Sequence, residues 1–357
     1  MTEAPPEILF DRRGTAGLVT LNRPQALNAV TLGMVRAFTR RLRQWRDDPA
    51  ITRVVLTAAG GRAFSAGGDI RALYDAGTGG RHDEMLAFYG EEYALNTMIK
   101  HYPKPYVALI DGIVMGGGVG LSIHGSHRVA GDRYLFAMPE VGIGFFPDVG
   151  ATWFLPRMPG RLGAYCALTG ERLNAADGLA ASLATHRVSS ARFAELRDAL
   201  CGEVSVDALL AAFAEPTGEA VVARRRETID RLFQGEGIED ILSALDMAAV
   251  AGGPNAQFAE ATAAAVRGKS PTSLKLALAQ IHAGKALTFG ACMQTEFRIV
   301  SRIIHGHDFY EGVRAVIVDK DNSPRWRPAA LRDVTRCTVE RHFAPLQPGE
   351  PAELTLP

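Results

Sequence analysis

Apolar and polar residues alternate with two different periods along the first half of the chain. Residues 17–21 and 53–57 are short runs of apolar and β-branched side chains, which predict strands. Further runs of this kind lie at residues 105–110, 127–130 and 134–137. Thr31 opens a segment in which the apolar residues follow helical spacing: Leu32, Val35, Phe38, Leu42 and Trp45. Strands that alternate with helices predict an α/β architecture.

Beyond about residue 188 the pattern becomes Ala-rich and helical. Ser270 and Pro271 stand in the order favoured at the N-cap and first position of a helix. The next helix is expected to carry an apolar stripe that faces the core, formed by Met293, Phe297, Val300 and Ile304. We therefore expect an α/β core over residues 8–190, an α-helical C-terminal region over 191–345 and a flexible, Pro-rich tail over 346–357.

Composition and charge narrow the classes of protein. The 39 Lys and Arg residues balance 39 Asp and Glu residues, so no overall field attracts the chain to nucleic acid or to an anionic membrane. The apolar runs fall far short of the ~20 residues that cross a bilayer. The first ten residues lack the cationic start and apolar stretch of an export signal, and we expect a cytoplasmic protein. Four well-separated cysteines argue against a zinc, haem or disulfide framework.

Two glycine-rich segments, each following a strand, are the first candidates for a binding site. They read A-F-S-A-G-G-D-I over residues 63–70 and G-I-V-M-G-G-G over 112–118. The second is not a dinucleotide-binding fingerprint, because Leu121 and Ile123 occupy the places of the last glycine. Either segment alone is explained by a tight turn. Together they offer backbone N–H donors from separate loops, an arrangement that stabilises the oxyanion formed from a thioester or another acyl group.

Two carboxylates, Glu140 and Asp148, stand among apolar residues and glycines in residues 136–150. Burial there would raise the pKa values of both side chains, and their mutual repulsion would raise one of them further. A carboxyl group that titrates near neutral pH is suited to general acid or base catalysis. Capping of a turn is the alternative reading of Asp148.

The segments A-F-S-A-G-G-D-I, M-G-G-G-V-G and A-M-P-E, in this order, resemble the crotonase, or enoyl-CoA hydratase/isomerase, superfamily. The resemblance implies a crotonase-like spiral of β-β-α units with an α-helical C-terminal region and a coenzyme A thioester as substrate. It also implies an oxyanion hole made by the backbone N–H groups of Gly68 and Gly117. No metal or other cofactor is implied, since coenzyme A is part of the substrate. A homo-oligomer and a monomer both remain open.

One position separates this chain from the hydratases of the superfamily. They use two glutamates, of which one matches Glu140 and the other falls at Gly120 in this sequence. Hydration needs one group to activate water and another to protonate carbon, so the missing carboxylate disfavours this reaction. The segment M-P-E-V-G-I-G-F-F-P-D-V-G, which includes Asp148, is similar instead to the 3-hydroxyisobutyryl-CoA hydrolase subfamily, and further similarity continues to about residue 328.

This narrower resemblance implies hydrolysis of (S)-3-hydroxyisobutyryl-CoA to 3-hydroxyisobutyrate and free coenzyme A, a step of valine catabolism. Glu140 is expected to act as general base on water or as the nucleophile, and both roles stay open. Asp148 is expected to bind the substrate's 3-hydroxyl group or to orient the water, and Glu92 is carried over as a residue of the substrate pocket. The alternatives are an enoyl-CoA isomerase or hydratase and a non-catalytic acyl-CoA-binding scaffold.

Overall fold

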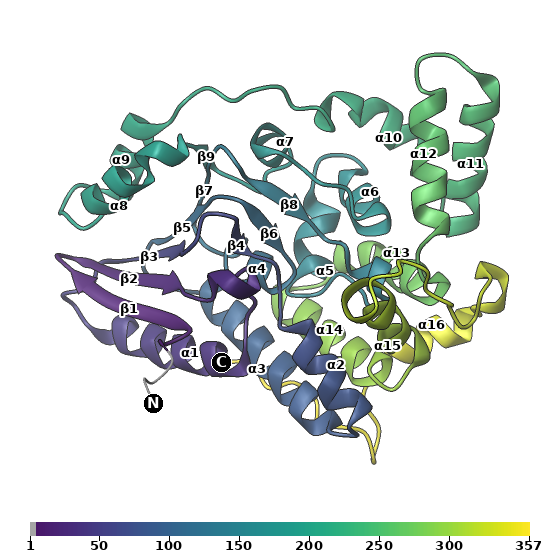
Figure 1. Ribbon diagram of the computed structural model, residues 1–357, viewed down its shortest axis with the longest axis horizontal. Helices are drawn as coiled ribbons and strands as arrows, with labels where there is room; N and C mark the ends of the chain where they lie inside the picture. The colour runs from purple at the N-terminus through teal and green to yellow at the C-terminus, as the bar shows by residue number, and fades with distance from the viewer. Residues whose placement is uncertain (1–4) are drawn as a thin grey trace.

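The structure, a computed structural model, describes residues 5–357 and contains two β-sheets wrapped by helices (Figure 1). In the six-stranded sheet the order is β1 (Ile8–Arg13), β2 (Ala16–Leu21), β3 (Arg53–Ala58), β5 (Tyr106–Ile110), β7 (His127–Ala130) and β9 (His186–Arg187). Only β1 is antiparallel to its neighbour in this sheet. The smaller, parallel sheet consists of β4 (Ala63–Ser65), β6 (Ile113–Met115) and β8 (Leu135–Ala137).

From β3 onward, successive strands alternate between the two sheets. After β3 the chain enters β4 in the small sheet, and α2 (Ile70–Thr78) and α3 (His82–Lys100) then return it to β5. The next turn runs through β5, β6 and α4 (Gly117–Gly120), and it is followed by β7 and β8. Each turn adds one strand to each sheet, so the expected spiral of β-β-α units is confirmed.

The strands and the helix predicted for the first half are present, but β4 and β6, which lie inside the two glycine-rich segments, and helices α2 and α3 were not predicted. Helix α1 (Leu32–Asp47) begins where Thr31 accepts a hydrogen bond from the Met34 N–H group at 3.2 Å, and its apolar face is buried. The sequence analysis missed β1, because most of its side chains are exposed or half-buried and it therefore lacks an apolar run. Antiparallel pairing with β2 holds this strand in place.

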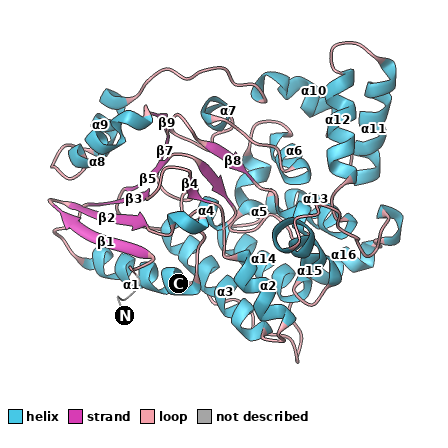
Figure 2. Cartoon of the chain, in the orientation of Figure 1, coloured by secondary structure: helices cyan, strands magenta, loops and turns pink. Residues whose placement is uncertain are grey.

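The C-terminal region is helical, as Figure 2 shows, but it shares its apolar core with the α/β part. Three short helices, α5 (Ala151–Phe154), α6 (Leu162–Thr169) and α7 (Ala175–Ala180), precede it. It contains α8 (Phe193–Ala199), α9 (Val206–Phe213), α10 (Arg226–Leu232), α11 (Ile238–Ala251), α12 (Ala256–Arg267), α13 (Pro271–Gly284), α14 (Phe289–Ile303), α15 (His307–Val313) and α16 (Arg336–Phe343). Side chains of α8 and α9 pack on the large sheet, whereas α13 and α14 belong to the larger core, where α14 packs on α3 and α13 packs on α6. As predicted, the Ser270 hydroxyl caps α13 by accepting the Ser273 N–H group at 3.2 Å.

Residues 346–357, which we expected to be flexible, pack against α14. Arg298 and Arg302 lie one turn apart on this helix and form ion pairs with Glu353 and Glu350, each at 2.8 Å. Leu354 is only 8% exposed. The prolines of the tail disfavour regular structure, but its two glutamates match the spacing of the arginines, and these contacts hold the segment on the helix.

Candidate active site

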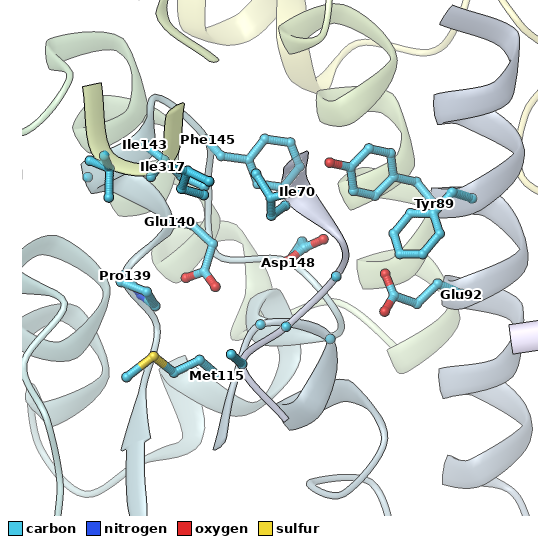
Figure 3. A pocket seen from close by; sticks show the side chains of 18 of the residues that line it. Ile70, Tyr89, Glu92, Met115, Pro139, Glu140, Ile143, Phe145, Asp148 and Ile317 are labelled. Carbon is cyan, nitrogen blue, oxygen red and sulfur yellow. The ribbon is translucent and has the colours of Figure 1, made fainter. Parts of the chain in front are cut away.

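One cavity of about 330 Å³ brings all the predicted site residues together (Figure 3). Gly68, Glu92, Gly117, Glu140 and Asp148 all line it. Most of the remaining wall is apolar and is formed by Ile70, Phe88, Met115, Ile143, Phe145, Val316 and Ile317. The spiral carries the two glycine segments and the segment after β8 to the same edge of the small sheet, while α3 supplies the opposite wall.

The two glycines present backbone N–H groups that have no protein acceptor within residues 5–357. Gly68 precedes Asp69, the capping residue of α2, and Gly117 is the first residue of α4. Val30 bonds to the neighbours of Gly68, since its N–H group donates to the Gly67 carbonyl at 2.8 Å and its carbonyl accepts from Asp69 N–H at 2.9 Å. This parallel bridge turns the N–H group of Gly68 away from Val30.

Residue 117 has no free room for a side chain, because Glu92 and the other glycine loop both lie close to it. A Cβ atom on Gly117 would lie 2.5 Å from Glu92 Oε1 and 3.2 Å from the Gly68 nitrogen. Gly116 takes a φ of 45°, which a glycine adopts without strain. A glycine at position 117 therefore leaves the space that the Glu92 carboxyl group occupies beside the two loops.

Glu140 is the first residue of a short 3₁₀ turn, Glu140–Ile143, that follows β8. Its side chain is 6% exposed, and its Oε2 atom has no hydrogen-bond partner among the described residues. Burial, with a further contribution from the charge of Asp148, raises the pKa of Glu140 well above the ordinary value of a glutamate. Glu140 thus offers a buried carboxyl oxygen to whatever occupies the cavity.

Asp148 and Glu92 are the other two acids of the cavity. Asp148 is 5% exposed and accepts a hydrogen bond from the Tyr93 hydroxyl at 2.9 Å through Oδ2. Burial raises the pKa of Asp148 to about 7, and the Tyr93 hydrogen bond opposes part of this rise. Glu92 is 2% exposed, its Oε1 atom has no partner among residues 5–357, and burial and the charge of Asp148 raise its pKa well above the ordinary value. Ionising one of these acids makes it harder to ionise the others.

Three residues around this site were not assigned a role from the sequence. Tyr93 holds Asp148, and Tyr89 lines the cavity one helical turn before it. Glu92 and Tyr93 follow Tyr89 by three and four residues on α3, so the three side chains lie on one face of the helix, and this spacing is visible in the sequence. Glu296 on α14 accepts the N–H groups of Gly150 at 2.8 Å and Thr152 at 2.9 Å, and so fixes the loop after Asp148. Nothing in the sequence relates Glu296 to a segment so distant along the chain.

The space around Gly120 is filled by other groups. A Cβ atom at this position would lie 2.8 Å from Asn96 Nδ2 and 2.8 Å from Val149 Cβ, and both of these residues are buried. The second glutamate implied for hydratases therefore has no room here.

The chain belongs to the crotonase, or enoyl-CoA hydratase/isomerase, superfamily. The family model described as "Enoyl-CoA hydratase/isomerase" matches residues 16–343. The structure has the α/β crotonase fold, with a mixed and a parallel sheet and a helical C-terminal region. Within residues 5–357 there is no helix long and apolar enough to cross a membrane.

Curated relatives and solved structures are similar over nearly the whole chain. A Danio rerio protein named "3-hydroxyisobutyryl-CoA hydrolase, mitochondrial" is 44% identical, covering 97% of this chain and 91% of the relative. The Homo sapiens protein of the same name is 41% identical, and the match covers 97% of this chain and 90% of that protein. The structure of a carnitinyl-CoA dehydratase from Mycobacterium thermoresistibile superposes with a TM-score of 0.91, at 40% identity and with 98% and 99% of the chains covered. The structure of an enoyl-CoA hydratase from Rhodobacter sphaeroides 2.4.1 superposes with a TM-score of 0.90 at 37% identity. The match covers 98% of this chain and 100% of the hydratase chain.

Proposed function

We propose that this chain is a thioesterase that hydrolyses (S)-3-hydroxyisobutyryl-CoA to 3-hydroxyisobutyrate and free coenzyme A. The observation that carries the proposal is the meeting, in one cavity, of two unpaired backbone N–H groups and the unpaired Glu140 carboxyl oxygen. Relatives at 41% and 44% identity that bear the name of this hydrolase support the choice of substrate.

In the proposed mechanism the thioester carbonyl oxygen lies between the N–H groups of Gly68 and Gly117. Negative charge develops on this oxygen as the carbonyl carbon becomes tetrahedral, and each N–H donor contributes on the order of 10²–10³ in rate. Glu140 either takes a proton from the attacking water or attacks the carbon itself to give a mixed anhydride, which water then hydrolyses. In both routes the C–S bond breaks, the thiol leaves as coenzyme A and the acyl group gains the oxygen of water.

The direct test is an assay of thiol release from (S)-3-hydroxyisobutyryl-CoA. We expect stoichiometric formation of free coenzyme A and 3-hydroxyisobutyrate. Migration or hydration of the double bond of an enoyl-CoA, without thiol release, would contradict the proposal and indicate an isomerase or a hydratase. Tight binding of acyl-CoA with no chemical change would indicate a scaffold protein.

A hydratase or dehydratase is the second candidate, because two specific observations favour it. Both solved structures reported above carry such names. In addition, Glu92 and Glu140 each present an unpaired carboxyl oxygen among the described residues, so that one could activate water and the other protonate carbon. Gain or loss of the conjugated enoyl absorbance distinguishes this reaction from thioester hydrolysis.

Asp148→Asn is expected to reduce the preference for a hydroxylated acyl chain by at least about tenfold, because a charged acceptor for the 3-hydroxyl group is lost. The measurement compares kcat/KM for 3-hydroxyisobutyryl-CoA and isobutyryl-CoA in the wild type and the variant. An equal change for both substrates would show that Asp148 does not recognise the hydroxyl group.

The pH dependence of kcat/KM should report the raised pKa of Glu140. Either role of Glu140 requires the ionised form, so activity should increase with pH, with a midpoint well above the ~4.3 of an ordinary glutamate. Asp148→Asn removes the neighbouring negative charge and should move this midpoint down. Rates of thiol release between pH 5 and 9, corrected for spontaneous hydrolysis, measure both effects. A plateau already complete at pH 5 would contradict the assignment.

The cellular compartment of this chain is proposed separately from its activity. The relatives are named as mitochondrial proteins, whereas we expected this chain to be cytoplasmic. Fractionation of the source cells, with detection of the chain in each fraction, tests that expectation.

A further inference from the structure

Tyr89 places a hydroxyl group without a protein partner in the cavity wall. The residue is on α3, its side chain is 2% exposed, and the hydroxyl oxygen is buried without a hydrogen-bond partner among residues 5–357. It lines the same cavity as Glu92 and Asp148. In Figure 3 the hydroxyl group points away from its helix, toward the side where Phe145 lies.

The ring of Tyr89 is held in this position by its aromatic neighbours. It stacks on Phe145 with centroids 5.4 Å apart and an interplanar angle of 22°, and Phe88 packs edge-on at 5.4 Å. These contacts hold the ring in the position where its hydroxyl oxygen has no partner among the described residues. Because a buried polar group without a partner is costly, the hydroxyl group needs an acceptor supplied by the contents of the cavity.

The surroundings also fix which hydrogen-bonding role the group plays. Burial and the charges of Asp148 and Glu92 raise the pKa of Tyr89 well above that of a free phenol, so the group keeps its proton and is available as a donor. Asp148, in contrast, is suited to accept a hydrogen bond. Its Oδ2 atom is engaged by Tyr93, and its other carboxyl oxygen can accept a hydrogen bond.

We infer that Tyr89 is a specificity-determining residue that donates a hydrogen bond to the hydroxyl oxygen of the substrate's acyl chain. This inference rests on the proposed function and assigns a residue to its selectivity. An alcohol donates one hydrogen bond and accepts others, so the substrate's hydroxyl group can accept from Tyr89 while it donates to Asp148. A plain acyl chain satisfies neither group and leaves both polar atoms unpaired among apolar walls, which disfavours its binding and turnover.

The test is the selectivity of Tyr89→Phe, which removes only the hydroxyl group. We expect the ratio of kcat/KM for 3-hydroxyisobutyryl-CoA to that for isobutyryl-CoA to fall on the order of 10–100-fold. The loss should fall on the hydroxylated substrate, with the rate for isobutyryl-CoA unchanged or increased. Tyr165→Phe is the matched control, since its hydroxyl group bonds to Glu171 at 3.2 Å outside the cavity, and the ratio should remain that of the wild type.

A second measurement separates recognition from a general disturbance of the site. In the Glu140→Gln background, the difference between the Kd values of the same two acyl-CoAs should become smaller when Tyr89→Phe is added, and Asp148 should account for the difference that remains. Equal effects on both substrates, or no effect on either, would overturn the role of Tyr89. If the wild type releases thiol from neither substrate, the proposed function has failed. If it hydrolyses the hydroxylated one and Tyr89→Phe keeps the wild-type ratio, only this inference has failed.

Discussion

Replacing Glu140 by glutamine is expected to abolish thiol release while leaving the fold intact. Glutamine has the same shape but can neither take a proton from water nor attack a carbonyl carbon. If Glu140 is a general base, kcat should fall about 10²–10⁴-fold. If it is the nucleophile, the loss should be larger, approaching the ~10⁶-fold measured when a nucleophile is removed from a protease. Single-turnover rates of thiol release measure the loss and thereby distinguish the two mechanisms.

The same variant should be more stable than the wild type at alkaline pH. The pKa of Glu140 is raised in the folded chain, whereas in the unfolded chain it is ordinary, at ~4.3. The folded state therefore holds this proton more tightly, and the wild type loses stability as pH rises from about 4.3 through the raised pKa. Glutamine carries no charge at any pH, so the difference in Tm between variant and wild type should grow from pH 5 to pH 9.

Glu91→Gln is the matched control for both measurements. Glu91 precedes the cavity residue Glu92 on α3, but its side chain is exposed and pairs with Arg36 on α1. A surface ion pair of this kind contributes only ~0–1 kcal/mol, so thiol release should be normal and the pH dependence of Tm should match the wild type. Turnover by Glu140→Gln with a normal melting curve would exclude the assignment of this residue.

The residues that sequence reasoning could find are those whose chemistry is local. Gly68 and Gly117 stand in glycine-rich turns after strands, and Glu140 and Asp148 are acids within apolar segments. Each combination is unusual over a few residues, and the order of the motifs resembles that of a known superfamily. The structure places these four residues and Glu92 around one cavity.

The contacts that sequence reasoning could not find join segments far apart in the chain. The hydrogen bonds from Gly150 and Thr152 to Glu296 link the loop after Asp148 to a C-terminal helix. The packing of the tail depends on ion pairs with α14, of which its Pro-rich composition gives no sign. Tyr89 resembles an ordinary core aromatic residue until its neighbours show that its hydroxyl group has no protein partner.

The acidic side chains of the cavity link the stability of the folded chain to the proposed reaction. Glu92, Glu140 and Asp148 are all buried; among residues 5–357, one carboxyl oxygen of Glu92 and one of Glu140 have no hydrogen-bond partner, and Asp148 is bonded by the neutral Tyr93 hydroxyl group. Their repulsion disfavours full ionisation, so the site tends to retain a proton near neutral pH. A retained proton is useful in thioester hydrolysis, because the leaving thiolate needs one. The stability lost at high pH is thus the consequence of burying three acids around one cavity.

Gly117→Ala is expected to lower kcat/KM by at least about 10²–10³-fold, the effect of losing one oxyanion donor. The added Cβ atom would lie 2.5 Å from Glu92 Oε1 and 3.2 Å from the Gly68 nitrogen, so the Glu92 side chain must move and the Gly68 loop must shift slightly. The Gly68 donor would then leave the position that the carbonyl oxygen requires. Steady-state rates of thiol release measure the loss.

Gly33→Ala provides the control for glycine replacement in general. Gly33 is an exposed residue of α1, where the nearest atom to an added Cβ, Thr31 Oγ1, would lie at 3.6 Å. This variant should keep full activity and should be at least as stable as the wild type, because alanine is favoured over glycine in helices. Full activity of Gly117→Ala would contradict the oxyanion hole. A fall in kcat with an unchanged Kd for a non-hydrolysable thioether analogue would locate the defect in the transition state, where the two N–H groups are proposed to act.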